Sequence, residues 1–146
     1  MSTSLPEARY RALEAAVAVL GLGLSMGSAH GGPLDRVMQA MESDYQALSQ
    51  ALFREDYARA KEAAESLANH PTPGFAEKLA LMGRLGTAAM RFQELNGQVE
   101  QAARDIASAA EARSLDRMTA GFKHLTDRCL ACHRRFGDSI SPDGQE

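Results

Sequence analysis

The sequence predicts an all-α protein, an antiparallel up-down-up-down four-helix bundle, and three observations lead to this fold class. Of the 146 residues, 45% are hydrophobic and 24% charged, as in an ordinary soluble domain. Only 5% are aromatic, Trp is missing and alanine is abundant, which is typical of closely packed helices. From Leu34 onward, apolar residues recur at helical spacing. Four amphipathic helices with mostly short connections favour alternating directions.

The first two helices are expected at 34–53 and 57–68. On the first, one face carries an apolar stripe of Leu34, Val37, Met38, Met41, Tyr45, Leu48 and Leu52. Asp56 is expected to cap the second helix, because its carboxylate can accept a hydrogen bond from a free N–H of the first turn. The sequence Asn-His-Pro-Thr-Pro-Gly at 69–74 ends that helix.

Residues 75–112 keep the helical period without a clear stop. A single helix of that length would extend about 57 Å, nearly twice the length of the first. We therefore expect a break near Gly83 and Gly86, which leaves a short helix at 75–82 and a long one at 87–112. Ser114 then caps the fourth helix. Its apolar stripe is Leu115, Met118, Phe122, Leu125, Cys129, Cys132 and Phe136.

The fourth helix contains the run Cys129-Leu130-Ala131-Cys132-His133, a C-x-x-C-H motif. This is the signature of covalent c-type haem attachment. Thiols three residues apart share a helix face, so both can add to the vinyl groups of one porphyrin. His133 shares that face and is the expected proximal iron ligand. The sequence thus predicts one covalently bound haem c per chain.

Two other interpretations of the cysteines are a redox disulfide and half of a zinc site. A thioredoxin-like disulfide belongs in a βαβ context, and no strand-like alternation precedes Cys129. Structural zinc requires four converging ligands. The obvious further candidate, His124, lies about 180° around the helix from His133.

Residues 1–29 have the pattern of an export signal. Arg9 and Arg11 form a basic patch, an apolar run follows at 15–24, and small residues at 27–29 suit cleavage. The alternative is a short first helix, which Glu7 and Glu14 would favour. Ten apolar residues are too few to cross a bilayer, so no membrane span is expected once the signal is removed. The predicted domain is then 30–146, in the periplasm, where this haem chemistry takes place.

The sixth iron position has several candidates at the haem end of the predicted bundle. Met38 and Met41 lie one and two turns into the first helix, on its apolar stripe, and His70 lies in the loop after the second helix. Met118 is about 22 Å from His133 along the same helix and is excluded. Met26 is removed with the predicted signal, and Met82 and Met90 are expected to be packing residues.

From about Leu34 to Phe136 the chain resembles the class II c-type cytochromes, the cytochrome c prime family. The shared features are an exported four-helix bundle, a C-x-x-C-H motif late in its last helix, and an aromatic residue three positions later, here Phe136. The family often has its distal residue three positions before a second apolar one on the first helix. Met38-Gln39-Ala40-Met41 fits that pattern, and the resemblance to low-spin members implies Met38 as the sixth ligand. An arginine four positions before the distal residue is frequent in the family, but Leu34 stands there.

A His133–iron–Met38 centre leaves no open position on the iron, favours low-spin iron and has a higher potential than bis-imidazole ligation. The expected function is that of a c-type cytochrome, which carries one electron between redox partner proteins and is not an enzyme. The alternative is a gas-binding haem protein, with five-coordinate iron or a methionine that NO or CO displaces. Ligation by His70 is a third possibility.

The expected partners are other redox proteins. A net charge of −3 gives no indication of nucleic-acid binding. The family resemblance alone implies a homodimer through the first two helices. Arg134 and Arg135 flank the motif and are candidates to pair with a haem propionate or with an acidic patch of a partner. They are equally well explained as solvated arginines at a helix end.

Overall fold

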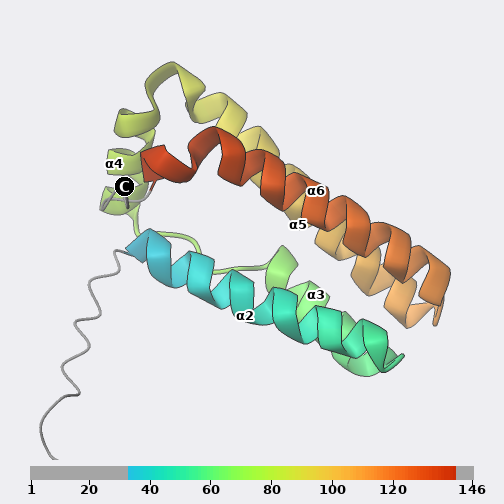
Figure 1. The fold of residues 1–146 in the computed structure, drawn as a ribbon. Coiled ribbons are helices and arrows are strands. Elements are labelled where there is room, and N and C mark those ends of the chain that lie inside the picture. Colours follow the sequence, from blue (N-terminus) through green and yellow to red (C-terminus); the bar gives the residue numbers. More distant parts are fainter. Residues whose placement is uncertain (1–32, 141–146) are drawn as a thin grey trace, which may run out of the picture. The chain divides into compact units, whose positions relative to one another are not determined.

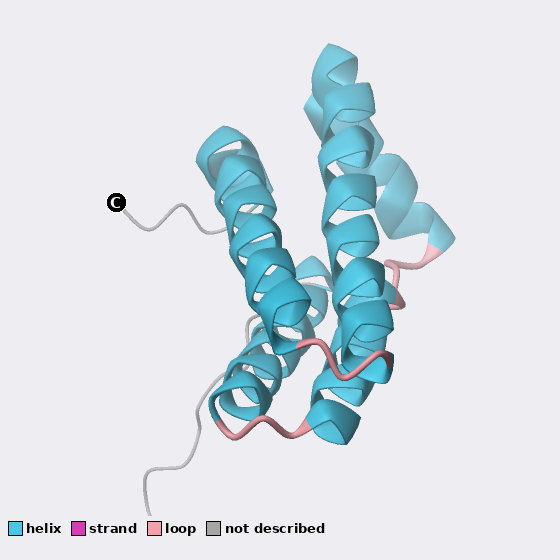
Figure 2. Cartoon of the chain, turned by 90° about the vertical axis from the view of Figure 1, so that its right-hand side faces the viewer, coloured by secondary structure: helices cyan, strands magenta, loops and turns pink. Residues whose placement is uncertain are grey.

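Four long helices pack together in this protein: α2 (Pro33–Phe53), α3 (Tyr57–Ala68), α5 (Ala89–Glu111) and α6 (Leu115–Ile140). The computed structural model describes residues 33–140, and every regular element in that range is helical (Figures 1 and 2). The short helix α4 (Phe75–Leu85) and the 3₁₀ turn η1 (Gly86–Ala88) lie between α3 and α5. The predicted all-α helical bundle is confirmed. The predicted signal at 1–29 lies outside the described residues.

Two interhelical turns at one end of the bundle are closed in the same way. After α2, the Asp56 N–H donates to the Ala51 carbonyl over 2.9 Å, and Glu55 has a positive φ of 52°. After α5, the Ser114 N–H donates to the Ala109 carbonyl over 3.0 Å, and Arg113 also has a φ of 52°. This pattern satisfies helix-end carbonyls and reverses the chain within a few residues.

The predicted starts of α3 and α6 are confirmed. At α3, the Asp56 carboxylate accepts a hydrogen bond from the Arg59 backbone N–H over 3.1 Å, as expected of a cap. Helix α6 begins directly after Ser114, whose backbone carbonyl accepts from the Met118 N–H over 3.0 Å.

The break before α5 occurs at one of the two expected glycines. Helix α4 passes through Gly83 and ends at Leu85, three residues beyond the predicted end. Gly86 has a φ of 52° together with a ψ of −125°, a combination that lies outside the left-handed helical region and favours glycine. Because η1 follows, α5 begins at Ala89, two residues later than predicted.

Most of the hydrophobic core lies in a large cluster among α2, α3, α5 and α6, which we call the far-end cluster. Alanine supplies many of its members, so the helix axes approach closely there. Its buried residues are Leu48, Ala51, Ala60, Ala63, Ala64, Leu67, Ala68, Val99, Ala102, Ala103, Ile106, Ala107, Ala109, Ala110, Met118 and Leu125.

A second, smaller cluster joins α4 to the start of α5 and the end of α6; we call it the motif-end cluster. Its buried residues are Leu81, Leu85, Leu95, Phe136 and Ile140. The rings of Phe92 and Phe136 meet edge to face, 5.4 Å between centroids. Leu34, near the start of α2, packs against this cluster. The core of the bundle is therefore in two parts.

Candidate cofactor site

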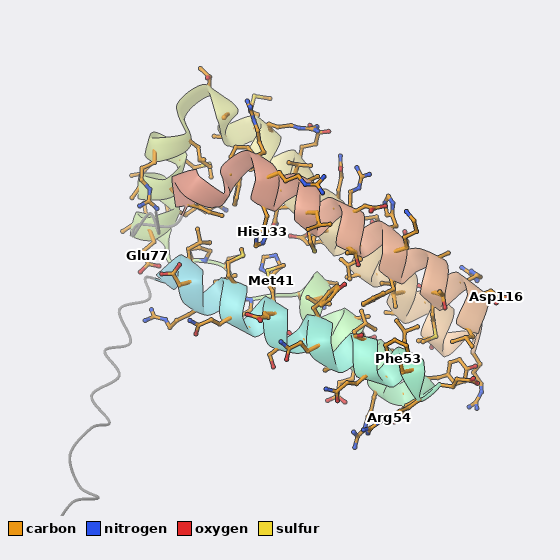
Figure 3. All side chains as sticks on the ribbon, in the orientation of Figure 1. Met41, Phe53, Arg54, Glu77, Asp116 and His133 are labelled. Atoms are coloured by element: carbon orange, nitrogen blue, oxygen red, sulfur yellow. The ribbon has the colours of Figure 1, made fainter. Side chains whose placement is uncertain are left out.

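The C-x-x-C-H motif lies within α6, at the junction of the two clusters. Cys129 packs against the far-end cluster and Cys132 against the motif-end cluster. Both thiols are free and half-buried, whereas the side chain of His133 is exposed. Figure 3 shows His133 of α6 and Met41 of α2 both pointing into the space between these two helices. The helix therefore presents two thiols and an imidazole within five residues.

Burial governs the ionisation of both thiols. It raises the pKa of Cys129 above its ordinary range, and the neighbouring Cys132 raises that pKa further. Burial also raises the pKa of Cys132. Both side chains are therefore protonated at neutral pH in the free-thiol form, which makes them poor thiolate nucleophiles.

The methionines of the predicted stripes lie at two levels of the bundle. On α2, Met38 and Met41 are both half-buried, and Met41 packs against the far-end cluster. Met118, near the start of α6, has no exposed surface and belongs to the far-end core. Its exclusion as an iron ligand therefore agrees with its burial far from His133 along α6.

The other two methionines of the described residues, Met82 and Met90, have different surroundings. Met82 is partly buried against the motif-end cluster, and its sulfur accepts a weak hydrogen bond from Gln93 over 3.6 Å. Its predicted packing role is confirmed. The same prediction for Met90 is wrong, because this side chain is 82% exposed at the start of α5. The break at Gly86 leaves Met90 on the outer side of the new helix.

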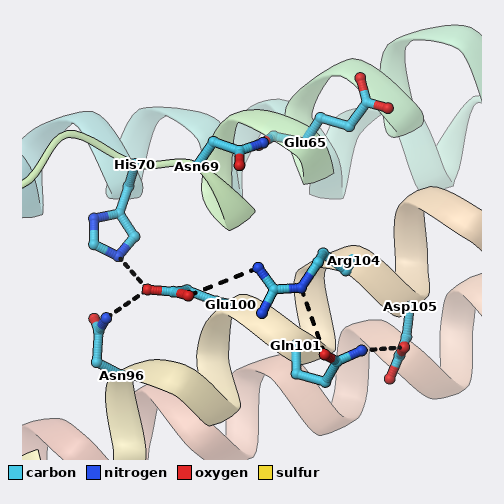
Figure 4. Close-up of polar contacts among 8 residues, drawn as sticks. All are labelled: Glu65, Asn69, His70, Asn96, Glu100, Gln101, Arg104 and Asp105. Carbon is cyan, nitrogen blue, oxygen red and sulfur yellow. Dashed lines mark hydrogen bonds and ion pairs between the residues drawn. The ribbon is translucent and has the colours of Figure 1, made fainter. Parts of the chain in front are cut away.

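His70 lies in the loop after α3, and its side chain is only 7% exposed. Its Nδ1 is 3.0 Å from the Pro71 carbonyl oxygen, and its Nε2 is 3.7 Å from the Glu100 carboxylate of α5. Asn96 donates to that carboxylate over 2.7 Å, and Arg104 lies 3.7 Å from its other oxygen (Figure 4). His70 therefore faces a polar network on α5.

Arg128, beside the first cysteine, was not singled out by sequence analysis. Its Nη1 donates to Gln98 of α5 over 3.1 Å, while its buried Nε has no hydrogen-bond partner. Gln98 in turn donates to Glu94 over 3.1 Å, and Glu94 pairs with Arg91 at 2.7 Å. This chain of contacts fixes α5 beside the motif. No local sequence signal reveals it, since 30 residues separate Arg128 from Gln98.

The two arginines after the motif, Arg134 and Arg135, are exposed. Neither forms an ion pair with a side chain in the part of the chain that the structure describes. Their exposure is compatible with both predicted roles.

Across 33–140, no three His, Cys, Asp or Glu side chains converge as a group that could hold a metal ion. None of the helices in this range is both long and apolar enough to cross a membrane. No protein-family model matches the chain, and neither a curated protein nor a solved structure was found to be similar to it.

Proposed function

We propose that this chain is a periplasmic c-type cytochrome that carries one electron between redox partner proteins. Cys129 and Cys132 would attach one haem covalently, and His133 and Met38 would bind its iron. When bound, the haem supplies a metal centre that accepts and returns one electron. The position of the C-x-x-C-H motif on α6, at the junction of the two core clusters, carries this proposal.

The residues at the junction fit a covalently held haem. The two half-buried thiols lie three positions apart on one helix, the spacing that places them on a shared face. They contact different core clusters, so a group attached to both would lie between two apolar regions. The exposed His133 imidazole has no hydrogen-bond partner among the described residues that would compete for its nitrogen atoms.

An up-down-up-down order of the helices, with the haem at one end, is supported by one contact near each end of the bundle. Near the far end, the guanidinium of Arg113, just before α6, lies 4.9 Å from the ring of Tyr57, just after the turn that ends α2. At the other end, Leu34 of α2 packs in the same cluster as Phe136 and Ile140 of α6. Both contacts support an antiparallel arrangement of α2 and α6.

The choice of Met38 is supported by the register of these two helices. The Tyr45 hydroxyl of α2 and the Thr126 hydroxyl of α6 are 2.8 Å apart, so these residues lie at one level. Seven residues from Tyr45 toward the start of α2 lead to Met38, and seven from Thr126 toward the end of α6 lead to His133. Seven residues are nearly two helical turns, so each pair keeps its face, and both positions lie about 10.5 Å along the axes. Met41 is only four residues from Tyr45 and falls short of the level of His133.

Roles for the chain's other residues follow from this arrangement. The apolar stripe of α2 and the two clusters would exclude water from a bound haem, and the packed helices would hold its ligands in place. A haem held by the His133 imidazole and the Met38 thioether would suit electron transfer better than the binding of a further ligand.

The proposal is tested by the absorption spectra of the purified protein in both oxidation states. We expect low-spin iron and, in the ferric state, a sulfur-to-iron charge-transfer band. Met38→Ala should abolish that band, while the matched variant Met41→Ala should keep it. His70→Ala should leave the spin state unchanged.

Other spectra would contradict the proposal. A high-spin spectrum of the unaltered protein that changes on adding NO or CO would favour a gas-binding protein instead. Loss of the low-spin state in His70→Ala would indicate bis-histidine ligation. Absence of bound haem after export with the haem-attachment machinery would refute the assignment as a c-type cytochrome.

A further inference from the structure

A hydrogen bond with a defined direction joins α2 to α6 next to the candidate site. Tyr45 Oη and Thr126 Oγ1 are 2.8 Å apart, although 81 residues separate them in the chain. Thr126 Oγ1 is also 2.8 Å from the Phe122 carbonyl oxygen, one turn earlier on α6. A carbonyl only accepts, so the single threonine proton goes to Phe122. The Tyr45 hydroxyl therefore donates to Thr126.

The same tyrosine also contacts α6 through its ring. The ring of Tyr45 stacks on that of Phe122 with 4.9 Å between the centroids and an angle of 25° between the planes. Stacked aromatic rings attract each other beyond the burial of their surface. Tyr45 thus holds α2 against α6 by two separable contacts, one through the hydroxyl and one through the ring.

We propose that Tyr45 is a positioning residue that sets how firmly Met38 holds the sixth position of the iron. This inference rests on the proposed function. Tyr45 lies nearly two turns from Met38 on the same face of α2, and its acceptor lies at the same interval from His133 on α6. A shift of α2 away from α6 at Tyr45 would therefore withdraw the Met38 sulfur from the iron bound by His133.

Displacement of the Met38 sulfur would be linked to the breaking of the hydrogen bond between Tyr45 and Thr126. An added ligand binds only when the sulfur has left, so its apparent affinity falls by the factor that favours the Met38-bound state. A contact that is made only while α2 stays in place contributes to that factor. The Tyr45–Thr126 hydrogen bond would thereby favour electron transfer by the protein over the binding of added ligands.

The test is Tyr45→Phe in the haem-loaded protein, because this variant keeps the ring on Phe122 and removes only the hydroxyl. The probes are imidazole for the ferric state and carbon monoxide for the ferrous state, each titrated optically. We expect the apparent affinity for both to rise about fivefold, the equivalent of one hydrogen bond of about 1 kcal/mol. The sulfur-to-iron band should weaken in parallel.

Variants of the acceptor give a second, independent measurement. Thr126→Val removes the acceptor and should raise the affinity for imidazole by a similar factor, whereas Thr126→Ser keeps the hydroxyl and should restore the unaltered value. Combining Tyr45→Phe with Thr126→Val should add little to either single change, because both remove the same bond.

The matched control is Tyr57→Phe. Tyr57 opens α3 at the far end, where its ring lies under the Arg113 guanidinium. Loss of the Tyr57 hydroxyl should leave the affinities for imidazole and carbon monoxide unchanged. Urea unfolding of all variants separates positioning from stability, because a purely structural role would lower stability without changing ligand affinity.

The outcomes distinguish this inference from the proposed function. If the unaltered protein shows the sulfur-to-iron band but Tyr45→Phe and Thr126→Val bind imidazole as it does, the positioning role is wrong and the cytochrome assignment stands. If the unaltered protein lacks that band, Met38 is not the ligand, and both the ligand assignment and the role of Tyr45 are overturned.

Discussion

The two ends of this bundle are packed with different side chains. At the far end, alanines and a few large residues such as Leu48, Ile106 and Met118 are fully buried among four helices. At the motif end, the fully buried residues come from α4, α5 and α6, with Leu34 of α2 packed against them, while Phe75 and Leu79 of α4 are 84% and 65% exposed. The far end specifies the fold through close packing. At the motif end, the two thiols are half-buried and the His133 imidazole is exposed.

The largest expected difference between the ends is in cofactor attachment. Replacing both cysteines (Cys129→Ser with Cys132→Ser) should abolish covalent haem, because no thiol is left to form a thioether. Extraction with acidified acetone and intact-protein mass measurement provide the test. Each single variant should keep one thioether, while the far-end variant Leu48→Ala should keep both. Pigment that stays with the double serine variant after extraction would rule out this mode of attachment.

Truncation of a buried side chain at the far end should lower the free energy of unfolding strongly. Truncation of an exposed side chain at the motif end should change it very little. Leu48 has no exposed surface, so Leu48→Ala should lower the free energy of unfolding by about 2–5 kcal/mol. Met90→Ala removes an exposed side chain and should stay within about 0.5 kcal/mol. Urea unfolding followed by circular dichroism measures both. Equal losses would show that the two ends do not differ in packing as described.

Added volume gives a third comparison, between two helical glycines. A Cβ at Gly121 of α6 would lie 2.7 Å from Cγ1 of Ile106, so Gly121→Ala should cost about 1–3 kcal/mol through overpacking. A Cβ at Gly97 of α5 meets nothing within 4 Å, so Gly97→Ala should gain about 0.5–1 kcal/mol through helix propensity.

A double-mutant cycle checks the cause of that cost. Ile106→Ala should be less destabilising in the Gly121→Ala background than alone, because it removes the clashing carbon. If the two effects were additive, the lower stability of Gly121→Ala would have a cause other than the contact with Ile106.

The smallest expected effects are those of two aspartates with opposite pKa shifts. Burial raises the pKa of Asp44, so its charged form destabilises the fold above that raised pKa and the penalty disappears as the pH falls below the unfolded-state value. Asp44→Asn should therefore gain at most about 0.5 kcal/mol at pH 7 and nothing at low pH.

For Asp127, a hydrogen bond from Lys123 and the lysine charge lower the pKa of the carboxyl. Its contribution is present above the unfolded-state pKa and is lost as the pH falls through the folded-state value. Asp127→Asn should thus slightly lower stability at pH 7 and have no effect at low pH. Urea midpoints at both pH values measure the two variants, and shifts of the same sign at pH 7 would contradict this account.

Several local features of the fold could be read from the sequence because neighbouring residues decide them. The predicted helix 57–68 matches α3, since Asp56 caps its start and the Asn-His-Pro sequence ends it. The expected break in 75–112 occurs at Gly86, the residue with positive φ. Gly83, by contrast, stays within α4. A glycine permits a break, and the surrounding packing determines where it occurs.

Other features depend on contacts between distant segments and could not be read in this way. Sequence periodicity could not determine that Met82 packs inward while Met90 is exposed, because the break at Gly86 resets the helix face. Nor could it pair Tyr45 with Thr126 or Arg128 with Gln98. Each pairing requires the axial register of two helices, which side-chain packing sets.

The sequence by itself determined the helices, most of their ends, and the placement of two cysteines and a histidine on one helix, because these depend on interactions within a few residues. Only the tertiary structure decided the division of the core into two clusters, with one cysteine against each, and the level of Met38 relative to His133. The physical reason is that a helix face follows from a period of 3.6 residues, whereas the axial register between two helices depends on how their side chains interlock.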